Sequence, residues 1–426
     1  MEKFSSIITV TGTKGKTTVV HAVEDVLRRL GQNTLKVDTT GHFVNGVRRS
    51  SLEDSKQTWQ LVPTVCPGRY LWEFHADPEL KRDGVAVLEA ALGSSSGSGL
   101  GYRKHKVGVF LNVFEDHINS SPRIRSKDDI VQAKDFVFRW IRADGWAVFN
   151  ADDEFVAKAV GSIPHGVNKL PVGVTFSQFD IDSHLREGGV AITVDSTGRY
   201  IVLKQGSETT VLADAAAIPW AFGGSFMPSV YNLLAAAGAL YGYFDGRLPE
   251  TIREVLESAR LDRYGGRLTL LKNRDNVTVL ADYAHEKVSL GRVGELARTM
   301  TSKDGQVIGV VRLAHDRTDQ LIQDTAHAIA GAYDQFVVYD KIDGYWRKPT
   351  QAKNRRFPQK TGYVSDVFAT ALRSKNPRVE RIVREDQAIQ KAAELARPGD
   401  VVVVIVNDSI ERSIGFIQQA FNAEFV

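Results

Sequence analysis

The chain has 426 residues, of which 43% are hydrophobic and 25% are charged, and its formal net charge is +3. This length predicts two or three domains, each with enough apolar residues to build a core. The small net charge provides no field that favours nucleic acid or an anionic membrane surface as a partner. The single cysteine, Cys66, excludes an internal disulfide and favours a reducing compartment.

Nothing near the N-terminus of the sequence indicates export or membrane insertion. The apolar run Phe4–Val10 is too short for a signal peptide and leads directly into a polar loop. The sequence contains no run of about 18 apolar residues, so we expect no membrane-spanning helix. These features favour a cytoplasmic enzyme or binding protein.

The first motif in chain order is a glycine-rich loop between the apolar run Ser6–Thr11 and a helical pattern from Thr17 to Leu30. Glycines let the backbone N–H groups of such a loop point at an anion, and the helix N-terminus adds its dipole. Lys16 supplies a point charge to the terminal phosphates, and Thr17 offers a hydroxyl to Mg²⁺. The expected nucleotide-binding residues are Gly12, Thr13, Lys14, Gly15, Lys16, Thr17 and Thr18. The alternative is an ordinary strand-to-helix turn, because the spacing between the glycines is shorter than in the usual P-loop.

Strand-like and helical patterns alternate up to residue 160, as in a doubly wound α/β fold. Nearly continuous apolar runs at Gly84–Glu89 and Val107–Val113 predict buried parallel strands, and further strands are expected at Leu35–Val37 and Gly145–Asn150. Helical spacing from Ser126 to Ala143 predicts one helix with Ser126 as its N-cap. Ligands of such a sheet bind at the carboxyl ends of its strands.

The pattern changes after Val172. Val190–Val194 and Tyr200–Leu203 flank a glycine-containing turn and predict a hairpin, which we expect in a small antiparallel sheet attached to the same domain. Helices are expected at Ser229–Tyr243 and Leu248–Ala259.

A domain boundary is expected near Leu261–Gly266, because strands and helices alternate anew beyond it. The expected strands of this second α/β domain are Val277–Ala281, Gln306–Val311, Gln335–Tyr339 and Asp400–Val406. The chain is thus divided into domains over residues 1–262 and 263–426.

Three polar elements in the first half are candidates for chemistry. Glu89 ends a buried strand and is placed to bind Mg²⁺ through its carboxylate, unless it is a solvated or capping residue. Asp116-His117 follows the next strand, where it would bind metal or orient phosphates, unless the histidine is structural. Lys134 lies within a helix and by itself reads as an ordinary surface lysine.

In their order along the chain, these elements resemble the Mur ligase superfamily of ATP-dependent amide ligases. The family's Gly-Thr-x-Gly-Lys-Thr/Ser loop matches Gly12–Thr17, its magnesium glutamate matches Glu89, and its Asp-His element matches Asp116-His117. Its lysine in an Ala-Lys helix, often carbamylated, matches Lys134. Its Asn-Ala-Asp-Asp turn matches Asn150–Asp153.

The resemblance continues through the second half of the chain. The family's nucleotide-contacting asparagine matches Asn232, its Gly-Arg matches Gly266-Arg267, and its Asp-Tyr-Ala-His matches Asp282–His285. The resemblance implies a central P-loop domain, with a doubly wound and mostly parallel sheet plus a small antiparallel sheet, over residues 1–262. It implies a Rossmann-like α/β C-terminal domain over residues 263–426.

Within the superfamily, the chain resembles most the Mur-ligase-like half of the cyanophycin synthetases. The segments that carry this similarity are Val87–Gly93, Ser98–Tyr102, Gly145–Asp153 and Ala396–Asp400.

Other segments, Asn112–His117 and Asp316–Asp319, resemble the ligase of poly-γ-glutamate synthases. The chain departs from the family where Glu286-Lys287 replaces the usual Asn-Pro and where Arg312–His315 replaces glycines. These departures concern the region expected to bind the incoming substrate.

The resemblance implies a reaction in which a substrate carboxylate attacks the γ-phosphate of ATP to give an acyl phosphate and ADP, after which an amine displaces phosphate. Thr17, Glu89 and His117 would arrange Mg²⁺, and Lys134 would serve a second ion as a carbamate. The expected catalytic residues are Lys16, Lys134, His117 and His285. The expected nucleotide contacts outside the loop are Asn232, Arg267 and Asp282, brought together by domain closure, and the candidate substrate contacts are His285, Asp316, Lys341 and Arg347.

The leading hypothesis is an amide ligase that joins an amino acid to the carboxylate of a peptide or amino-acid polymer. The alternatives are a poly-γ-glutamate synthase ligase subunit, which would need a membrane partner, and a non-catalytic ATP-binding regulatory partner. The chain begins at the phosphate-loop strand, so we expect no UDP-muramyl substrate. A separate partner protein with an ATP-grasp domain is a further open alternative. The sequence also leaves a homo-oligomer open.

Overall fold

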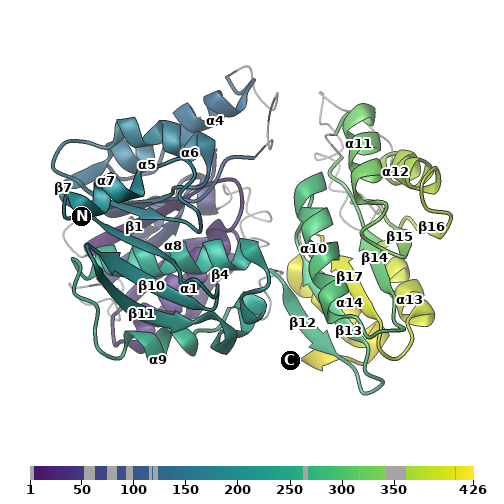
Figure 1. The fold of residues 1–426 in the computed structure, drawn as a ribbon. Helices are drawn as coiled ribbons and strands as arrows, with labels where there is room; N and C mark the ends of the chain where they lie inside the picture. The colour runs from purple at the N-terminus through teal and green to yellow at the C-terminus, as the bar shows by residue number, and fades with distance from the viewer. Residues whose placement is uncertain are drawn as a thin grey trace. The chain divides into compact units, whose positions relative to one another are not determined.

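The computed structural model describes residues 4–51, 63–73, 84–92, 99–114, 118, 123–261, 267–315, 317–341, 361–407 and 409–426. The chain divides into two compact units, Met1–Leu261 and Asp262–Val426 (Figure 1). Each unit is an α/β structure with its own sheet.

The described residues of the first unit form one eleven-stranded sheet in the order β11-β10-β9-β8-β7-β6-β1-β5-β2-β3-β4. Its strands are β1 (Phe4–Thr11), β2 (Thr34–Asp38), β3 (Gly41–Val44), β4 (Val47–Ser51), β5 (Gly84–Glu89), β6 (His105–Phe110), β7 (Ile141–Asn150), β8 (Asn168–Val172), β9 (Val190–Val194), β10 (Tyr200–Gln205) and β11 (Glu208–Asp214). The pairings from β2 through β5, β1, β6, β7 and β8 to β9 are parallel, and those at both ends of the sheet are antiparallel.

Helices cover both faces of this sheet, as Figure 1 shows. They are α1 (Lys16–Arg29), α3 (Arg69–Glu73), α4 (Lys127–Lys134), α5 (Phe136–Arg139), α6 (Glu154–Ala159), α7 (Ile181–Arg186), α8 (Met227–Tyr243) and α9 (Ile252–Glu257). Alternation along β5 divides its side chains between two cores, with Val85 and Val87 facing α1 and α8 and with Ala86 and Leu88 facing the opposite layer.

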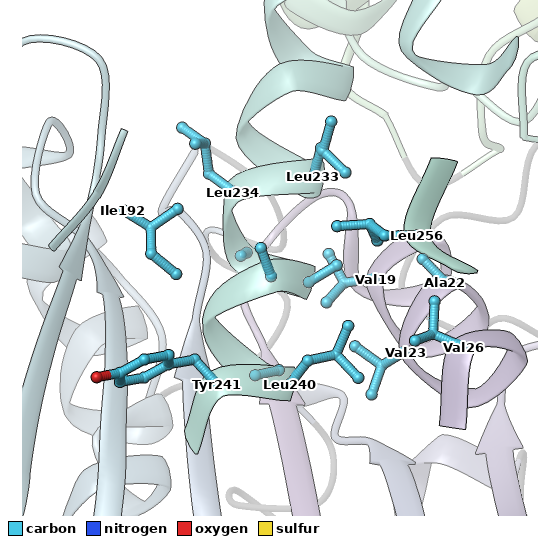
Figure 2. Packing of buried hydrophobic residues seen from close by; sticks show 14 of the residues in the cluster. Val19, Ala22, Val23, Val26, Ile192, Leu233, Leu234, Leu240, Tyr241 and Leu256 are labelled. Carbon is cyan, nitrogen blue, oxygen red and sulfur yellow. The ribbon is translucent and has the colours of Figure 1, made fainter. Parts of the chain in front are cut away.

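The core under α1 and α8 is built from aliphatic residues (Figure 2). Leu233 and Leu240 of α8 lie near Val19 and Val23 of α1, and Leu256 of α9 joins them. Burying one such side chain stabilises the fold by roughly 1.5–3 kcal/mol. This packing fixes α1, whose first turn follows the glycine-rich loop.

Most expected strands of the first unit are confirmed, and two boundaries are corrected. The helix expected from Ser126 to Ala143 is instead α4 followed by the short α5, and Ile141 opens β7. Pairing of His105 with Ile141 draws that residue into the sheet. The strand expected at Val107–Val113 ends at Phe110, because the next residues turn toward the glycine-rich loop.

The predicted hairpin is confirmed as β9 and β10, but its place differs from the expected small separate sheet. β11 pairs with β10, and Val172 of β8 pairs with Ile192 of β9, so the antiparallel strands extend the large sheet. Ser126 is confirmed as an N-cap, because its hydroxyl accepts from Asp129 N while the Asp129 carboxylate accepts from Ser126 N.

The described residues of the second unit form a seven-stranded sheet in the order β16-β15-β14-β17-β13-β12-β18. The strands are β12 (Thr269–Lys272), β13 (Thr278–Asp282), β14 (Val307–Val311), β15 (Gln335–Val338), β16 (Val379–Arg381), β17 (Val401–Ile405) and β18 (Glu424–Phe425). The helices are α10 (Lys287–Met300), α11 (Asp319–Ile329), α12 (Tyr363–Arg373), α13 (Glu385–Leu395) and α14 (Ile410–Phe421). The central pairings are parallel, and β12 pairs antiparallel with β13 and β18.

Candidate active site

The carboxyl ends of neighbouring parallel strands bring the candidate residues of the first unit to one edge of the sheet. Val10 of β1 pairs with Glu89 of β5, and Thr11 pairs with Phe110 of β6. On the other side of β5, Val37 of β2 pairs with Leu88. The segments that follow β1, β2, β5 and β6 therefore meet at this edge, where α/β proteins bind ligands.

The glycine-rich loop has a backbone that requires glycine at two points. Gly12 has φ +146° and Gly15 has φ +84°, both in the region that L side chains rarely adopt. A Cβ at Gly15 would lie 2.0 Å from Asn232 Oδ1, so the side chain of Asn232 on α8 lies directly against the loop. Gly15 is also the N-cap of α1, which places the loop at a helix N-terminus.

Asn112, two residues after β6, holds the loop in this shape. Its Oδ1 accepts hydrogen bonds from Thr13 N at 3.1 Å and Lys14 N at 2.8 Å, and its Nδ2 donates to Lys14 O at 3.1 Å. The Thr13 hydroxyl in turn accepts from Phe114 N. The loop is therefore preorganised by the segment that follows β6.

Lys16, Thr17 and Glu89 meet at the first turn of α1. The Thr17 hydroxyl donates to Glu89 Oε2 at 2.8 Å, and Lys16 Nζ lies 3.9 Å from Glu89 Oε1 and donates to Thr13 O. Glu89 is only 3% exposed, so these partners replace the contacts with water that its carboxylate loses on burial. Thr39, after β2, completes the group by donating from its hydroxyl to Glu89 Oε1 at 3.0 Å.

The oxygen atoms of Thr17, Thr39 and Glu89 fit the chemistry of a Mg²⁺ site. Mg²⁺ prefers hard oxygen ligands and is usually bound through one or two carboxylates together with substrate phosphates. Among the described residues there is no group of three or more His, Cys, Asp and Glu side chains that would hold a metal by itself. The expected ligand His117 lies outside the described residues.

Lys134, the last residue of α4, approaches the loop from the face of the sheet opposite to α1. Its Nζ donates to Gly12 O at 3.0 Å and to Thr11 Oγ1 at 3.3 Å, and the side chain is buried. The structure therefore does not place Lys134 as an ordinary surface lysine. In this arrangement its amine binds the backbone at the start of the loop.

Asn232 lines a small cavity together with Asn112, Asn150 and Tyr231. Beside it, the Asp152 carboxylate accepts from Tyr231 Oη at 2.8 Å and from the backbone or hydroxyl groups of residues 174–177. Burial alone would raise the pKa of Asp152, but these hydrogen bonds bring it below its ordinary value. The Asn150–Asp153 turn thus fixes the cavity wall and the loop after β8.

In the second unit, the predicted residues lie at the carboxyl end of β13. Asp282 ends this strand, and its Oδ2 accepts from Leu268 N at 3.0 Å. His285 Nδ1 donates to Tyr283 O at 3.0 Å. The guanidinium of Arg267 lies 5.0 Å from the centre of the Tyr283 ring.

Two further cations, which follow β14 and β15, approach the same ring. Arg312, directly after β14, is fully buried, lies 4.9 Å from the Tyr283 ring and donates to Val406 O at 2.6 Å. Lys341, after β15, lies 6.0 Å from the ring, and its carbonyl accepts from Asn407 Nδ2. Arg267, Arg312 and Lys341 therefore gather around Tyr283. Asp316 and Arg347, two of the four candidate substrate contacts, lie outside the described residues.

Sequence patterns missed two residues that the structure brings into this site. Asn112 belongs to a recognised motif, but nothing in the sequence assigned it the loop N–H groups. Thr39 follows the strand next to β5, so its position after a strand end was a usable signal. Its importance depends on the strand order, which places β2 beside β5.

Comparisons with known proteins give matches along most of the chain. The model of the Mur ligase middle domain matches residues 10–240, and the model of the Mur ligase glutamate ligase domain matches residues 266–405. Cyanophycin synthetase of Nostoc sp. strain PCC 7120 is 30% identical over 421 residues, which cover 97% of this chain and 42% of that protein. The chain therefore spans less than half the length of this relative.

Solved structures show the same fold at low sequence identity. FolC of E. coli in complex with ADP has a TM-score of 0.64 and 17% identity, with 98% of this chain and 90% of that chain covered. The bifunctional folylpolyglutamate synthase/dihydrofolate synthase of Yersinia pestis, complexed with AMPPNP and a Mn ion, has a TM-score of 0.62 and 17% identity, with coverage of 99% and 90%.

Among the helices in the described part of the chain, none has both the length and the apolar character that a membrane span requires.

Proposed function

Because the chain belongs to the Mur ligase family, we propose that it is an ATP-dependent ligase that forms an amide bond. Its substrates would be an amino acid and a carboxylate of a peptide or amino-acid polymer, as the similarity to cyanophycin synthetase suggests. The supporting observation is the meeting of the loop Gly12–Thr17 with Glu89 and Asn232 at one sheet edge. Residues 1–262 would bind ATP, and residues 263–426 would bind the incoming amino acid.

The first chemical step would activate the carboxylate. A carboxylate oxygen attacks the γ-phosphorus of ATP, the bond to the bridging oxygen of ADP breaks, and an acyl phosphate forms. Charge builds up on the phosphate oxygens, so positioning and electrostatics dominate catalysis. Lys16 and the loop N–H groups would bind the β- and γ-phosphates, and Asn232 would contact the nucleotide.

In the second step, the amine nitrogen attacks the acyl carbon, phosphate leaves, and the nitrogen loses a proton. His285 is the proposed catalytic residue of the second unit, with Lys341, Asp316 and Arg347 as further substrate contacts and with Arg267 and Asp282 on the nucleotide. Mg²⁺, when bound, would neutralise charge on the transferred phosphoryl group. Thr17, Thr39 and Glu89 would contact it, and His117 stays a predicted ligand.

Carbamylation of Lys134 stays a prediction. The buried Nζ lies next to the loop, where it donates to Thr11 Oγ1 and Gly12 O. Incubation with ¹³C-bicarbonate followed by NMR would show a carbamate signal that disappears in Lys134→Arg. A spectrum without that signal in the active protein would contradict the prediction.

A screen for ADP release tests the proposed function. The purified chain is incubated with ATP, Mg²⁺, single amino acids and short peptides that contain Asp or Glu, and the products are identified by mass spectrometry. We expect ADP release that requires both an amine and a carboxylate substrate, together with a product mass equal to their sum minus water. ATP binding without any product across the screen would favour the non-catalytic alternative.

Three expectations about the cellular context stay predictions. They are a cytoplasmic location, self-association, and a separate ATP-grasp or membrane partner. Size-exclusion chromatography with light scattering tests the second of them directly.

A further inference from the structure

A cluster of buried polar side chains lies between α1 and the end of β2. His21 of α1 has its Nε2 2.9 Å from Asp38 Oδ2, and Lys36 Nζ lies 3.4 Å from the same oxygen. Lys36 Nζ also lies 2.8 Å from His21 Nδ1. Asp38 is fully buried, and Lys36 and His21 are 4% and 6% exposed. Such a cluster is costly to bury unless its charges are paired within it.

The Lys36 ammonium lies beside the imidazole ring of His21, 2.8 Å from Nδ1 and 3.3 Å from Nε2, and the Asp38 carboxylate lies on the Nε2 side of the same ring. The Lys36 ammonium also lies 3.8 Å from the centre of the Phe43 ring on β3. The Lys36 ammonium and the Asp38 carboxylate are thereby paired within the cluster, and the imidazole of His21 connects them to α1.

The second oxygen of Asp38 shapes the tight turn between β2 and β3. Asp38 pairs with Gly41, which leaves Thr39 and Thr40 as the two residues of the turn. Two-residue hairpin turns favour Gly, Asn and Asp, so a Thr-Thr turn has little support from its own sequence. Asp38 Oδ1 supplies that support by accepting from Thr40 N at 2.7 Å and from Thr40 Oγ1 at 2.6 Å.

The two threonines of this turn face different carboxylates. Thr40 is bound to Asp38, whereas Thr39 donates from its hydroxyl to Glu89 Oε1 at 3.0 Å and from its N–H to Glu89 Oε2 at 3.3 Å. Thr17 donates to the same Glu89 carboxylate. Thr39 belongs to the turn that Asp38 connects to α1. The orientation of Thr39 toward the proposed metal site therefore depends on this turn.

We propose that Asp38, held by His21 and Lys36, is a positioning residue that orients Thr39 and Glu89 for binding of a divalent metal ion with the nucleotide. This inference rests on the proposed function, because it assumes that Glu89 and Thr39 contact the metal. Residues that orient metal ligands commonly change metal affinity by about 10- to 100-fold when they are replaced.

The test measures metal binding rather than turnover. Binding of Mn²⁺ to the full chain with AMPPNP is titrated by electron paramagnetic resonance, and thermal unfolding is recorded for each variant. Asp38→Asn removes the charge that binds His21 and Lys36, and we expect its Mn²⁺ dissociation constant to rise about tenfold or more. Thr40→Val leaves the buried charges intact and removes one hydrogen bond of the turn, so we expect a smaller rise, whereas Thr40→Ser should bind as the unmodified chain does.

Glu24→Gln is the matched control. Glu24 is a buried carboxylate on α1 that accepts from the Thr34 hydroxyl at 2.7 Å, so it also connects α1 to β2, but at the opposite end of that strand. This variant should lower the unfolding temperature and leave Mn²⁺ affinity unchanged. Equal weakening by Glu24→Gln, or unchanged affinity in both Asp38→Asn and Thr40→Val, would overturn the inference. Failure of the unmodified chain to bind Mn²⁺ with AMPPNP would instead contradict the proposed function.

Discussion

At the scale of single residues, the site depends on a few charges that are placed by neighbouring groups. Glu89 receives hydrogen bonds from Thr17 and Thr39 and lies 3.9 Å from the ammonium of Lys16. A buried carboxylate without such partners would be strongly destabilising. With these contacts, the carboxylate of Glu89 lies at the sheet edge where the phosphates of ATP are expected to bind.

Lys16→Met should reduce ligation without unfolding the chain. The ammonium would stabilise charge on the transferred phosphoryl group, and loss of one such group typically lowers kcat about 100- to 1,000-fold. The measurement is steady-state ADP release on a substrate pair found in the screen, with circular dichroism to verify folding. Lys169→Met, at an exposed position on β8, is the control with the same change of charge and should retain full activity.

Gly15→Ala should weaken nucleotide binding, because the new Cβ would lie 2.0 Å from Asn232 Oδ1 in a residue with φ +84°. Gly31→Ala is the matched control, since Gly31 has φ +78° and open space around its Cβ position. Both variants suffer backbone strain of roughly 1–2 kcal/mol, but only the first disturbs the loop. Calorimetric titration with ADP should show at least a tenfold loss of affinity, or roughly 1.4 kcal/mol, for Gly15→Ala alone. Equal affinities in the two variants would contradict a role of this loop in binding.

At the scale of elements, the site is a product of strand order. β1, β5, β2 and β6 are adjacent and parallel, so the segments after them converge although they are distant in sequence. Asn112 after β6 shows the consequence, because it binds the backbone of a loop about a hundred residues away. Its three hydrogen bonds make the loop ready for an anion before a ligand arrives.

Asn112→Ala should therefore weaken ADP binding. Each lost hydrogen bond is worth about 0.5–1.5 kcal/mol, so three of them predict a loss of roughly tenfold or more in affinity. Asn168→Ala removes an asparagine that donates to Gly145 O away from this edge and serves as the control. Fluorescence titration with a labelled ADP analogue would measure the affinity of both variants. Similar affinities in the two variants would mean that the loop keeps its shape without Asn112.

At the scale of the whole molecule, each unit packs its sheet against hydrophobic cores of its own, and stability is the small difference between large terms. The protonation of a single buried group therefore changes the free energy of unfolding by a measurable amount. His105, the first residue of β6, is 2% exposed, and its Nε2–H donates to Val137 O at 2.7 Å. Burial lowers the pKa of His105 to about 4, against about 6.5 in an unfolded chain.

The sign of the resulting pH dependence follows from proton binding. Between pH 6.5 and 4 the unfolded chain binds a proton at His105 that the folded chain does not, so stability falls as the pH is lowered through this window. The slope is at most about 1.4 kcal/mol per pH unit for one histidine. Chemical denaturation across this range should show a shallower slope for His105→Gln than for His165→Gln, which changes an exposed histidine. Burial also lowers the pKa of His42 to about 4, so part of the slope should remain in both variants.

The sequence by itself determined the parts of this protein whose signals are local. A phosphate-binding loop needs glycines, a lysine and a following helix within a few residues, so Gly12–Thr18 was recognisable. The buried strand Gly84–Glu89 and the N-cap Ser126 were recognisable for the same reason. Ordered motifs also sufficed for the family, since they span the whole chain.

Only the tertiary structure decided which distant groups meet. No local pattern states that β2 lies beside β5, and Thr39, Asp38 and His21 gain their roles from that neighbour relation. The same holds for Lys134, whose local pattern is that of an ordinary helical lysine. The family resemblance marked it as catalytic, but only the fold shows that its Nζ donates to Gly12 O. The physical reason is that hydrogen bonds and charge pairs act over a few ångströms in space, whereas sequence patterns report only neighbours along the chain.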